Sequence, residues 1–298
     1  MFTSLTPRPP LGQWVDVIWD CSGFSSPHHR ELRLPTPGAE LVFNLEDTPL
    51  RFADLASAKA VDRAGATALT GVTRFASLSG PHTRPFILDT SRPLLALGIH
   101  LKPIALASLF RVNAAELQNT HLPLEDLLGV DQLDVWYRLR EASSARRRIQ
   151  VVSDWLLERL SRSPQPHWAV PSALRRLRQG TDNVRLIANA AGLSERRLSA
   201  VLREQTGLGP KMYMRLRRFH RALDELSGTS VDWAGLANDV GYYDQSHLIR
   251  DFKDFSGLTP QRYLLRKTAH VNHVAIATPA PVSDSSNSEE PNAGMVRP

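Results

Sequence analysis

Two predicted helices in the third quarter of the chain carry cationic and polar side chains on one face. The helix that begins at Glu195 turns outward Arg196, Arg197, Ser199, Ala200 and Arg203. The helix that begins at Gln245 turns outward Gln245, Ser246, His247, Ile249, Arg250 and Lys253. Arginine can donate two hydrogen bonds to guanine, and Gln or Ser can contact other base edges, so this chemistry suits a helix in the major groove of DNA.

Each of these helices is the second helix of a predicted helix-turn-helix unit. The first unit spans Asn183 to Pro210, with Gly192 at the turn and Ser194 as the helix cap. Its inward side chains recur at helical spacing: Ile187, Ala188, Leu198, Val201 and Leu202. A single pattern of this kind is often only a helical hairpin, but two in tandem with cationic outer faces favour DNA binding.

The second unit spans Val231 to Leu264. Gly241 stands where its first helix should end, and the Asp244 carboxylate can cap the next helix. Its predicted inward side chains are Trp233, Leu236, Ala237, Leu248, Phe252 and Phe255. Gly257 and Pro260 end the helix.

A long helix from Pro210 to Leu226 should link the units and set their separation along a duplex at roughly one turn, about 34 Å. The segment from Ser172 to Thr268 has 17 Lys and Arg against 10 Asp and Glu, a net charge of +7, whereas the whole chain carries +6. The basic excess therefore lies where phosphate contacts are predicted.

The first 125 residues alternate between β-like runs and turns. Strands are predicted at Trp14–Trp19, Glu40–Leu45, Phe86–Leu88 and Leu94–Leu101, while residues 54–73 fit a hairpin or a loop. From Pro103 the period becomes helical, with a second short helical region ending at Gly129.

Residues 132–160 are predicted to form a long amphipathic helical stretch, broken near Ala142 to Ser144. Its apolar side chains are Val135, Leu139, Ile149, Val152, Trp155, Leu156 and Leu160, and they could pack on the same domain's core or form a dimer interface. Arg146, Arg147 and Arg148 are predicted to form a solvated patch, with contact to DNA phosphates as the alternative.

The run from Pro210 to Leu223 and the denser run GYYDQSHLIRDFKDFSGLTPQRY, from Gly241 to Tyr263, resemble the DNA-binding domain of AraC/XylS-type transcription regulators. Ala200 and Trp233 depart from the family's pattern. A looser resemblance, over Leu101–Gly129, is to the sensor half of one subgroup.

These resemblances imply an α+β chain in which a β-rich, barrel-like sensor domain with helices precedes an all-α domain of two helix-turn-helix units joined by a long helix. The expected division is a sensor domain at 1–160, a linker at 161–172, a DNA-binding domain at 173–268 and a disordered tail at 269–298. The implied partners are the major groove of double-stranded DNA and an unknown small-molecule effector. RNA polymerase contact and a homodimer are left open. An activator is expected, although the sequence itself leaves the sign of regulation open.

The composition argues against several other classes of protein. Cys21 is the only cysteine, which excludes an internal disulfide and a cysteine zinc site. The adjacent His28 and His29 would point to opposite faces of a strand, and no histidine–carboxylate cluster has ligand spacing, so we predict no metal, no cofactor and no enzyme. His82 and His100 could meet across strands. With no apolar run of about 18 residues and no signal segment, we expect a cytoplasmic protein without a membrane partner.

The sequence thus favours a one-component transcription regulator, with a DNA-binding module coupled to a metal-dependent, enzymatic sensor domain as the alternative. The effector and the operator are left open.

Overall fold

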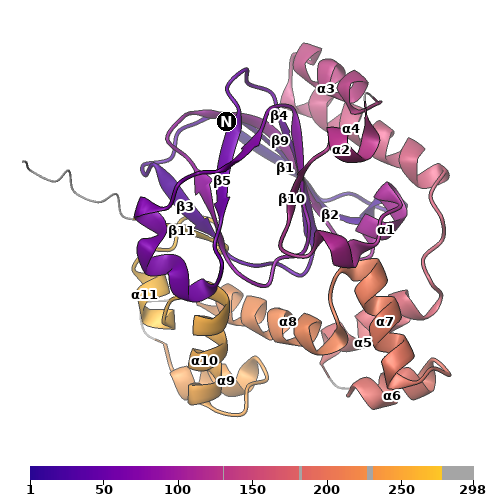
Figure 1. Cartoon of the computed structure of the whole chain (residues 1–298), viewed down its shortest axis with the longest axis vertical. Coiled ribbons are helices and arrows are strands. Elements are labelled where there is room, and N and C mark those ends of the chain that lie inside the picture. Colours follow the sequence, from indigo (N-terminus) through magenta and orange to yellow (C-terminus); the bar gives the residue numbers. More distant parts are fainter. Residues whose placement is uncertain (130, 181–182, 227–230, 277–298) are drawn as a thin grey trace, which may run out of the picture.

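The computed structural model describes residues 1–129, 131–180, 183–226 and 231–276. Two antiparallel sheets with helices on their flanks form the N-terminal half, and helices form most of the C-terminal half (Figure 1). The predicted α+β class is therefore confirmed. In the described part of the chain the strands belong to two separate sheets, so barrel-like describes their arrangement only loosely.

Sheet A has six strands in the order β1-β2-β9-β4-β7-β10. The strands are β1 (Phe2–Leu5), β2 (Val15–Phe24), β4 (Ala39–Asn44), β7 (Ala76–Ser79), β9 (Leu94–Leu101) and β10 (His121–Pro123). Strand β9 has the predicted bounds. It lies in the middle of the sheet, and five of its eight residues are buried, as its apolar run indicates.

Sheet B has five strands in the order β11-β3-β8-β5-β6. The strands are β3 (Arg30–Arg33), β5 (Leu50–Asp54), β6 (Gly71–Thr73), β8 (Phe86–Asp89) and β11 (His273–Ala275). Strand β11 forms one edge of this sheet and pairs antiparallel with β3. The paired residues are about 240 positions apart in the sequence.

Three parts of the prediction are corrected here. Residues 54–73 hold neither a simple hairpin nor a loop, because the 3-10 helix η2 (Ala58–Ala66) lies between β5 and β6. The region predicted as helical up to Gly129 includes strand β10, which lies between η3 (Ala114–Leu117) and α2 (Glu125–Leu128). Residues 269–276, expected to start a disordered tail, contain β11, held by backbone pairing with β3; residues 277–298 lie outside the described residues.

Helices α1 (Ala105–Phe110), α3 (Asp131–Glu141) and α4 (Ala145–Ser161) lie on the sheet A side of the molecule. One hydrophobic core joins their apolar residues to those of sheet A, including Leu41, Phe43 and Ile99. The side chains for which a dimer interface was left open belong to this core: Val135, Leu139, Ile149, Val152, Trp155 and Leu156 are buried, and Leu160 packs against them. Those side chains therefore support their own domain.

Arg148 is a correction to the predicted solvated patch. Arg146 and Arg147 are exposed, but the Arg148 guanidinium donates to both carboxylate oxygens of Asp20 on β2, at 2.5 and 3.0 Å. The Asp20 side chain is only 1% exposed. This hydrogen-bonded pair raises the pKa of Arg148 and ties α4 to sheet A.

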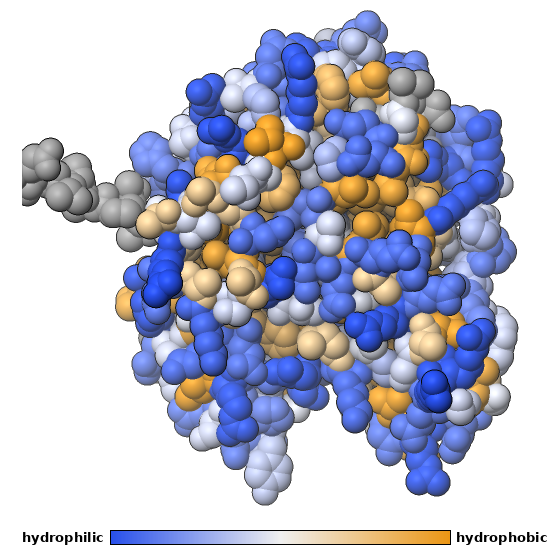
Figure 2. All heavy atoms as spheres, in the orientation of Figure 1, coloured by the Kyte–Doolittle hydropathy of each residue, from blue (hydrophilic) through white to orange (hydrophobic). Residues whose placement is uncertain are grey.

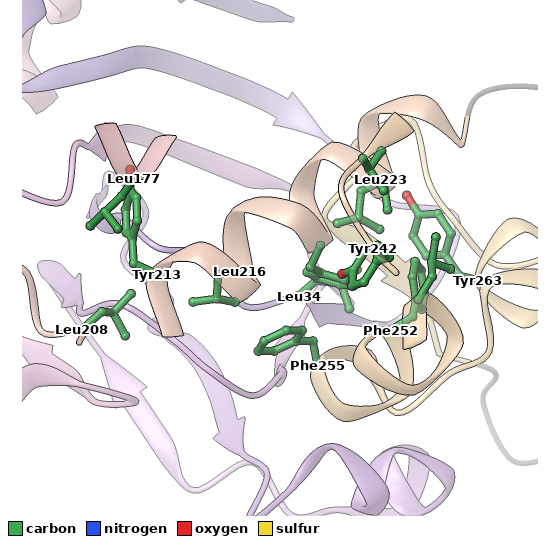
Figure 3. Packing of buried hydrophobic residues seen from close by; sticks show 14 of the residues in the cluster. Leu34, Leu177, Leu208, Tyr213, Leu216, Leu223, Tyr242, Phe252, Phe255 and Tyr263 are labelled. Carbon is green, nitrogen blue, oxygen red and sulfur yellow. The ribbon is translucent and has the colours of Figure 1, made fainter. Parts of the chain in front are cut away.

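A second hydrophobic core crosses from sheet B into the C-terminal helices. The helices are α5 (Ala169–Gln179), α6 (Val184–Ala190), α7 (Glu195–Thr206), α8 (Pro210–Glu225), α9 (Trp233–Asp239), α10 (Gln245–Ser256) and α11 (Pro260–Leu264). Leu34 of the segment after β3 lies beside Phe252 and Phe255 of α10 (Figure 3). The C-terminal helices are thus packed firmly on the N-terminal half, not merely tethered to it.

None of the helices in the described ranges combines the length and the apolar character needed to cross a bilayer.

Candidate nucleic-acid interface

The first helix-turn-helix unit comprises α6 and α7. Gly192, with a φ of +58°, makes the turn, and the Ser194 hydroxyl accepts a hydrogen bond from the Arg197 backbone N–H at 3.2 Å, capping α7. The predicted inward residues Ile187, Ala188, Leu198, Val201 and Leu202 are all buried. The helical spacing of the apolar residues therefore predicted correctly which face of each helix is buried.

The outer face of α7 is open to solvent. Arg196, Arg197 and Arg203 are exposed, and so is Ala200, while Ser199 is partly buried. Three guanidinium groups on one free face of a short helix can contact phosphates and base edges.

The second unit comprises α9 and α10. Gly241 has a φ of +87°, and the Asp244 carboxylate accepts a hydrogen bond from the His247 backbone N–H at 2.7 Å, capping α10. The predicted inward residues Leu236, Ala237, Leu248, Phe252 and Phe255 are buried, and Trp233 is partly buried against the same core.

The outer face of α10 divides into free and packed residues. Gln245, Ser246, Arg250 and Lys253 are exposed. His247 is partly buried because its ring packs edge-on against Tyr242, 5.1 Å between centroids. Ile249 is also partly buried and packs against the core, so it is less available than its predicted place on the outer face implied.

Helix α8 is the strut between the units. It starts with Pro210 in its first turn and spans 16 residues, which at 1.5 Å per residue is about 24 Å. Its inward side chains include Tyr213, Leu216 and Leu223, which run along the core in Figure 3. The bounds differ from the prediction by one residue at the C-terminal end.

Arg215 on the strut fixes α10 electrostatically. Its guanidinium lies 2.6 Å from the Asp251 carboxylate and 3.1 Å from that of Asp254. The hydrogen bond to Asp251 raises the pKa of Arg215, and its cationic group also lies over the Phe255 ring. The orientation of α10 relative to α8 therefore depends on polar as well as apolar contacts.

The two units end alike and face the N-terminal half at equivalent positions. Thr206 donates to the Leu202 carbonyl at 2.7 Å, and Ser256 donates to the Phe252 carbonyl at 2.6 Å. The glycine that follows each one, Gly207 or Gly257, has positive φ and lies directly against the N-terminal half. A Cβ at Gly207 would come within 2.8 Å of the Ala114 carbonyl of η3, and one at Gly257 within 2.0 Å of the Ala58 carbonyl of η2.

In space, the units lie on opposite ends of α8, and α8 runs below the sheets (Figure 1). Hydrophilic residues dominate the surface of both lower lobes, and the surface is hollowed between them (Figure 2). The contacts of these two glycines with the N-terminal half are at the C-terminal ends of α7 and α10, and Arg196 and Arg250 remain exposed.

Tyr243 is an interface candidate that the sequence analysis did not select. It lies in the turn just before α10 and is 93% exposed, whereas its neighbour Tyr242 is buried. An aromatic ring so fully in water next to the N-terminus of α10 is unusual for a residue with a packing role. The signal in the sequence was the extra residue between Gly241 and the cap, since the first unit has only Leu193 between Gly192 and Ser194.

The two sensor-region histidines that could have met across strands, His82 and His100, have different partners. His82 packs beside His121, with 4.7 Å between ring centroids, and His100 pairs with Glu40 at 2.9 Å, so His82 and His100 do not form the pair that was considered. Burial lowers the pKa of His121 to about 4. Across the residues that the structure describes, no group of three or more His, Cys, Asp or Glu is arranged to hold a metal ion.

Two family models match the chain. A helix-turn-helix domain model matches residues 187–266, and a domain of unknown function (DUF6597) matches residues 3–123. A curated relative from Streptomyces antibioticus, described as an AraC-like transcription regulator, is 26% identical over 194 residues, which are 61% of this chain. The chain covers 59% of the length of that relative.

Solved structures give weaker likenesses. ToxT from Vibrio cholerae covers 89% of this chain and 98% of its own length, with 11% identity and a TM-score of 0.44. The C-terminal domain of the response regulator yesN from Fusobacterium nucleatum covers 32% of this chain and 96% of its own length, with 20% identity and a TM-score of 0.29.

Proposed function

We propose that the whole chain is a transcription regulator of the AraC type that binds double-stranded DNA. Residues 187–266 match a helix-turn-helix domain model, and the 26% identical relative is described as AraC-like. The observation that carries the proposal is the pair of capped helices, α7 and α10, each of which leaves cationic side chains free on its outer face. A regulator of this kind works where the chromosome lies, which agrees with the cytoplasmic location expected from the sequence.

The proposed contacts divide the exposed residues by chemistry. Arg196 and Arg250 have the reach and geometry for two hydrogen bonds to guanine, and Gln245 can pair with adenine. Arg203, near the end of α7, and Lys253 are better placed for phosphates, which fix register without reading sequence. His247 and Ile249 contribute less because their side chains are partly buried.

The N-terminal half is proposed to receive a signal, from a small molecule or a protein partner. Support comes from the hydrophobic core that sheet B shares with the C-terminal helices. Through this core, a structural change in sheet B can shift α8 and α10. Contact with RNA polymerase and formation of a homodimer remain part of the proposal.

The direct test is selection of bound sequences from a random DNA pool, followed by gel-shift titration of the selected site. We expect Arg196→Ala and Arg250→Ala each to weaken specific binding by about 1–3 kcal/mol. Arg146→Ala, an exposed arginine on α4, is the matched control and should bind like the parent. If both interface variants bound the selected site as tightly as the parent, the assigned roles would be wrong.

A second prediction concerns Tyr243. We expect Tyr243→Ala to weaken DNA binding by about 0.5–1.5 kcal/mol, because its hydroxyl can donate to a phosphate beside the groove that α10 enters. Tyr243→Phe should lose a similar amount if the hydroxyl is responsible and very little if the ring is. Thermal unfolding serves as the control: a side chain 93% exposed should change stability by no more than about 0.5 kcal/mol.

A further inference from the structure

The chain does not stop at the DNA-binding domain but returns to the sensor half. After α11, residues 266–276, here named the return segment, include β11, whose register with β3 pairs His273 with Arg33, Val274 with Leu32 and Ala275 with Glu31. The backbone N–H of Leu34 donates to Asn272 at 2.9 Å, and that of Ile276 donates to Arg30 at 3.1 Å. The segment thus adds an edge strand to sheet B.

The return segment is also hydrogen-bonded to α11, which follows the second helix-turn-helix unit, and to the end of α8, which precedes that unit. The Tyr263 hydroxyl of α11 donates to the Val271 carbonyl at 2.6 Å, and Lys267 donates to the Leu226 carbonyl at the end of α8, also at 2.6 Å. Val274 is 1% exposed and lies in the same core as Tyr263. One short segment therefore connects the second unit to the sensor sheet.

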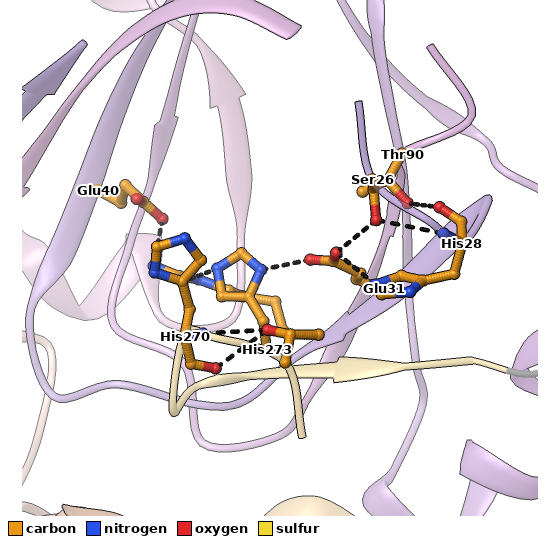
Figure 4. Close-up of polar contacts among 9 residues, drawn as sticks. Ser26, His28, Glu31, Glu40, Thr90, His270 and His273 are labelled. Atoms are coloured by element: carbon orange, nitrogen blue, oxygen red, sulfur yellow. Dashed lines mark hydrogen bonds and ion pairs between the residues drawn. The ribbon is translucent and has the colours of Figure 1, made fainter. Parts of the chain in front are cut away.

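A polar network holds this segment at His273 (Figure 4). The His273 Nδ1 atom lies 2.5 Å from the Glu31 carboxylate, and its Nε2 atom contacts the Arg33 guanidinium. Arg33 in turn donates to Glu40 on sheet A at 2.9 Å. Burial and the Arg33 charge lower the pKa of His273 to about 4, so the neutral ring donates to Glu31 and accepts from Arg33.

The network also runs deep into the sensor half. Although burial opposes it, the hydrogen bond from His273 helps to lower the pKa of Glu31 to about 2. Glu40 links Arg33 to His100 on β9, at 2.9 Å. A displacement of Arg33, or of Glu40, which holds Arg33, would therefore remove a partner from His273, the side chain through which edge strand β11 joins this network.

The two units differ in this respect. The first unit meets the sensor half through η3 and α1, whereas the second meets it through η2 and the return segment. Nothing in these contacts covers the outer faces of α7 and α10, whose arginines are exposed. The docked arrangement is therefore open to DNA, and its effect on binding is expected to be favourable preorganisation.

We propose that the return segment, held by His273 between Glu31 and Arg33, positions the second helix-turn-helix unit so that α7 and α10 engage one DNA site together. This rests on the proposed function and adds a route from the sensor to DNA affinity. Loosening the segment should weaken binding to a complete site and spare binding through the first unit alone, because only the second unit loses its fixed orientation.

The test uses a cysteine pair in the full chain. Glu31→Cys with Ala275→Cys removes a partner of His273 when reduced and covalently restores the docked strand when oxidised. These residues are opposite each other, and the hydrogen-bonded pairs on either side make theirs a close pair that suits a disulfide. Cys21, the only native cysteine, is buried. The readout is the dissociation constant for the selected site and for a site with the second unit's half scrambled.

We expect the reduced variant to bind the complete site roughly tenfold more weakly than the oxidised one. The scrambled site should be bound equally in both states. His273→Ala should resemble the reduced variant, and His29→Ala, an exposed histidine just before β3, should resemble the parent. Mass spectrometry confirms that the disulfide has formed.

Two outcomes would overturn the proposal while leaving the proposed function intact. One is equal affinity for the complete site in both redox states, since the segment would then have no positioning role. The other is tighter binding on reduction, since the docked segment would then restrain the second unit. If the parent chain selected no DNA sequence at all, the proposed function itself would fail.

Discussion

Replacing Arg148 with alanine should lower the free energy of unfolding by about 3–5 kcal/mol, since it leaves a buried carboxylate without its counter-charge. Asp20 is 1% exposed, and two guanidinium nitrogens of Arg148 hold its oxygens at 2.5 and 3.0 Å. Among the residues that the structure describes, the only other side chain that donates a hydrogen bond to Asp20 is that of Ser22, at 3.1 Å. A hydroxyl cannot compensate for a desolvated negative charge.

Urea denaturation of the variant, compared with the parent and with Arg147→Ala, measures this effect. Arg147 directly precedes Arg148 in the same helix, but its side chain is exposed. Its replacement should therefore lower the free energy of unfolding by no more than about 0.5 kcal/mol. The double variant Asp20→Leu with Arg148→Leu should recover much of the stability, because an apolar pair of similar volume removes the unpaired charge. An Arg148→Ala protein as stable as Arg147→Ala would show that Asp20 is solvated or paired elsewhere.

The contrast between these two arginines shows where sequence analysis stops. The run Arg146 to Arg148 lies on an amphipathic helix, and its helical period places it toward solvent. Asp20, the partner that decides the role of Arg148, lies 128 residues earlier. No local pattern distinguishes a paired arginine from its solvated neighbours.

The helix-turn-helix units were predictable because their determinants are local. Ser194 and Asp244 are caps whose partners lie three residues away, and the apolar period of α7 and α10 repeats within one helix. The start of α8 at Pro210 follows from the same kind of signal, since proline suits the first turn of a helix. The orientation of α10, in contrast, depends on Arg215 and could not be predicted.

The strands of sheet B were mostly missed for the opposite reason. Strand β3 has the sequence RELR, which has too few apolar residues to indicate a buried strand, although Glu31 and Arg33 are both buried. His273, about 240 residues away, contacts both side chains and so helps to stabilise them in the buried position. Strand β11 has only three residues in a segment whose composition suggested disorder, so only its pairing with β3 defines it.

Gly257→Ala should be the most disruptive single change at the contact between the two halves of the protein. Its φ of +73° already costs an alanine about 1–2 kcal/mol. A Cβ would then lie 2.0 Å from the Ala58 carbonyl and 2.6 Å from the Val61 side chain, both in η2. Overpacking of this kind adds about 1–3 kcal/mol, because a backbone carbonyl cannot rotate out of the way.

Gly192→Ala separates these two contributions. Gly192 also has positive φ, +58°, but its Cβ position has open space around it, so that variant should show only the conformational cost. The difference between the two variants in chemical denaturation is then the steric cost of the overlap between the added Cβ and η2. Hydrogen exchange should also rise in residues 58–66 for Gly257→Ala alone, since α10 can relieve the overlap only by moving away from η2. Equal destabilisation by the two substitutions, with unchanged exchange in η2, would mean that α10 and η2 are not in contact in solution, and the second unit would then be free of the sensor half at this point.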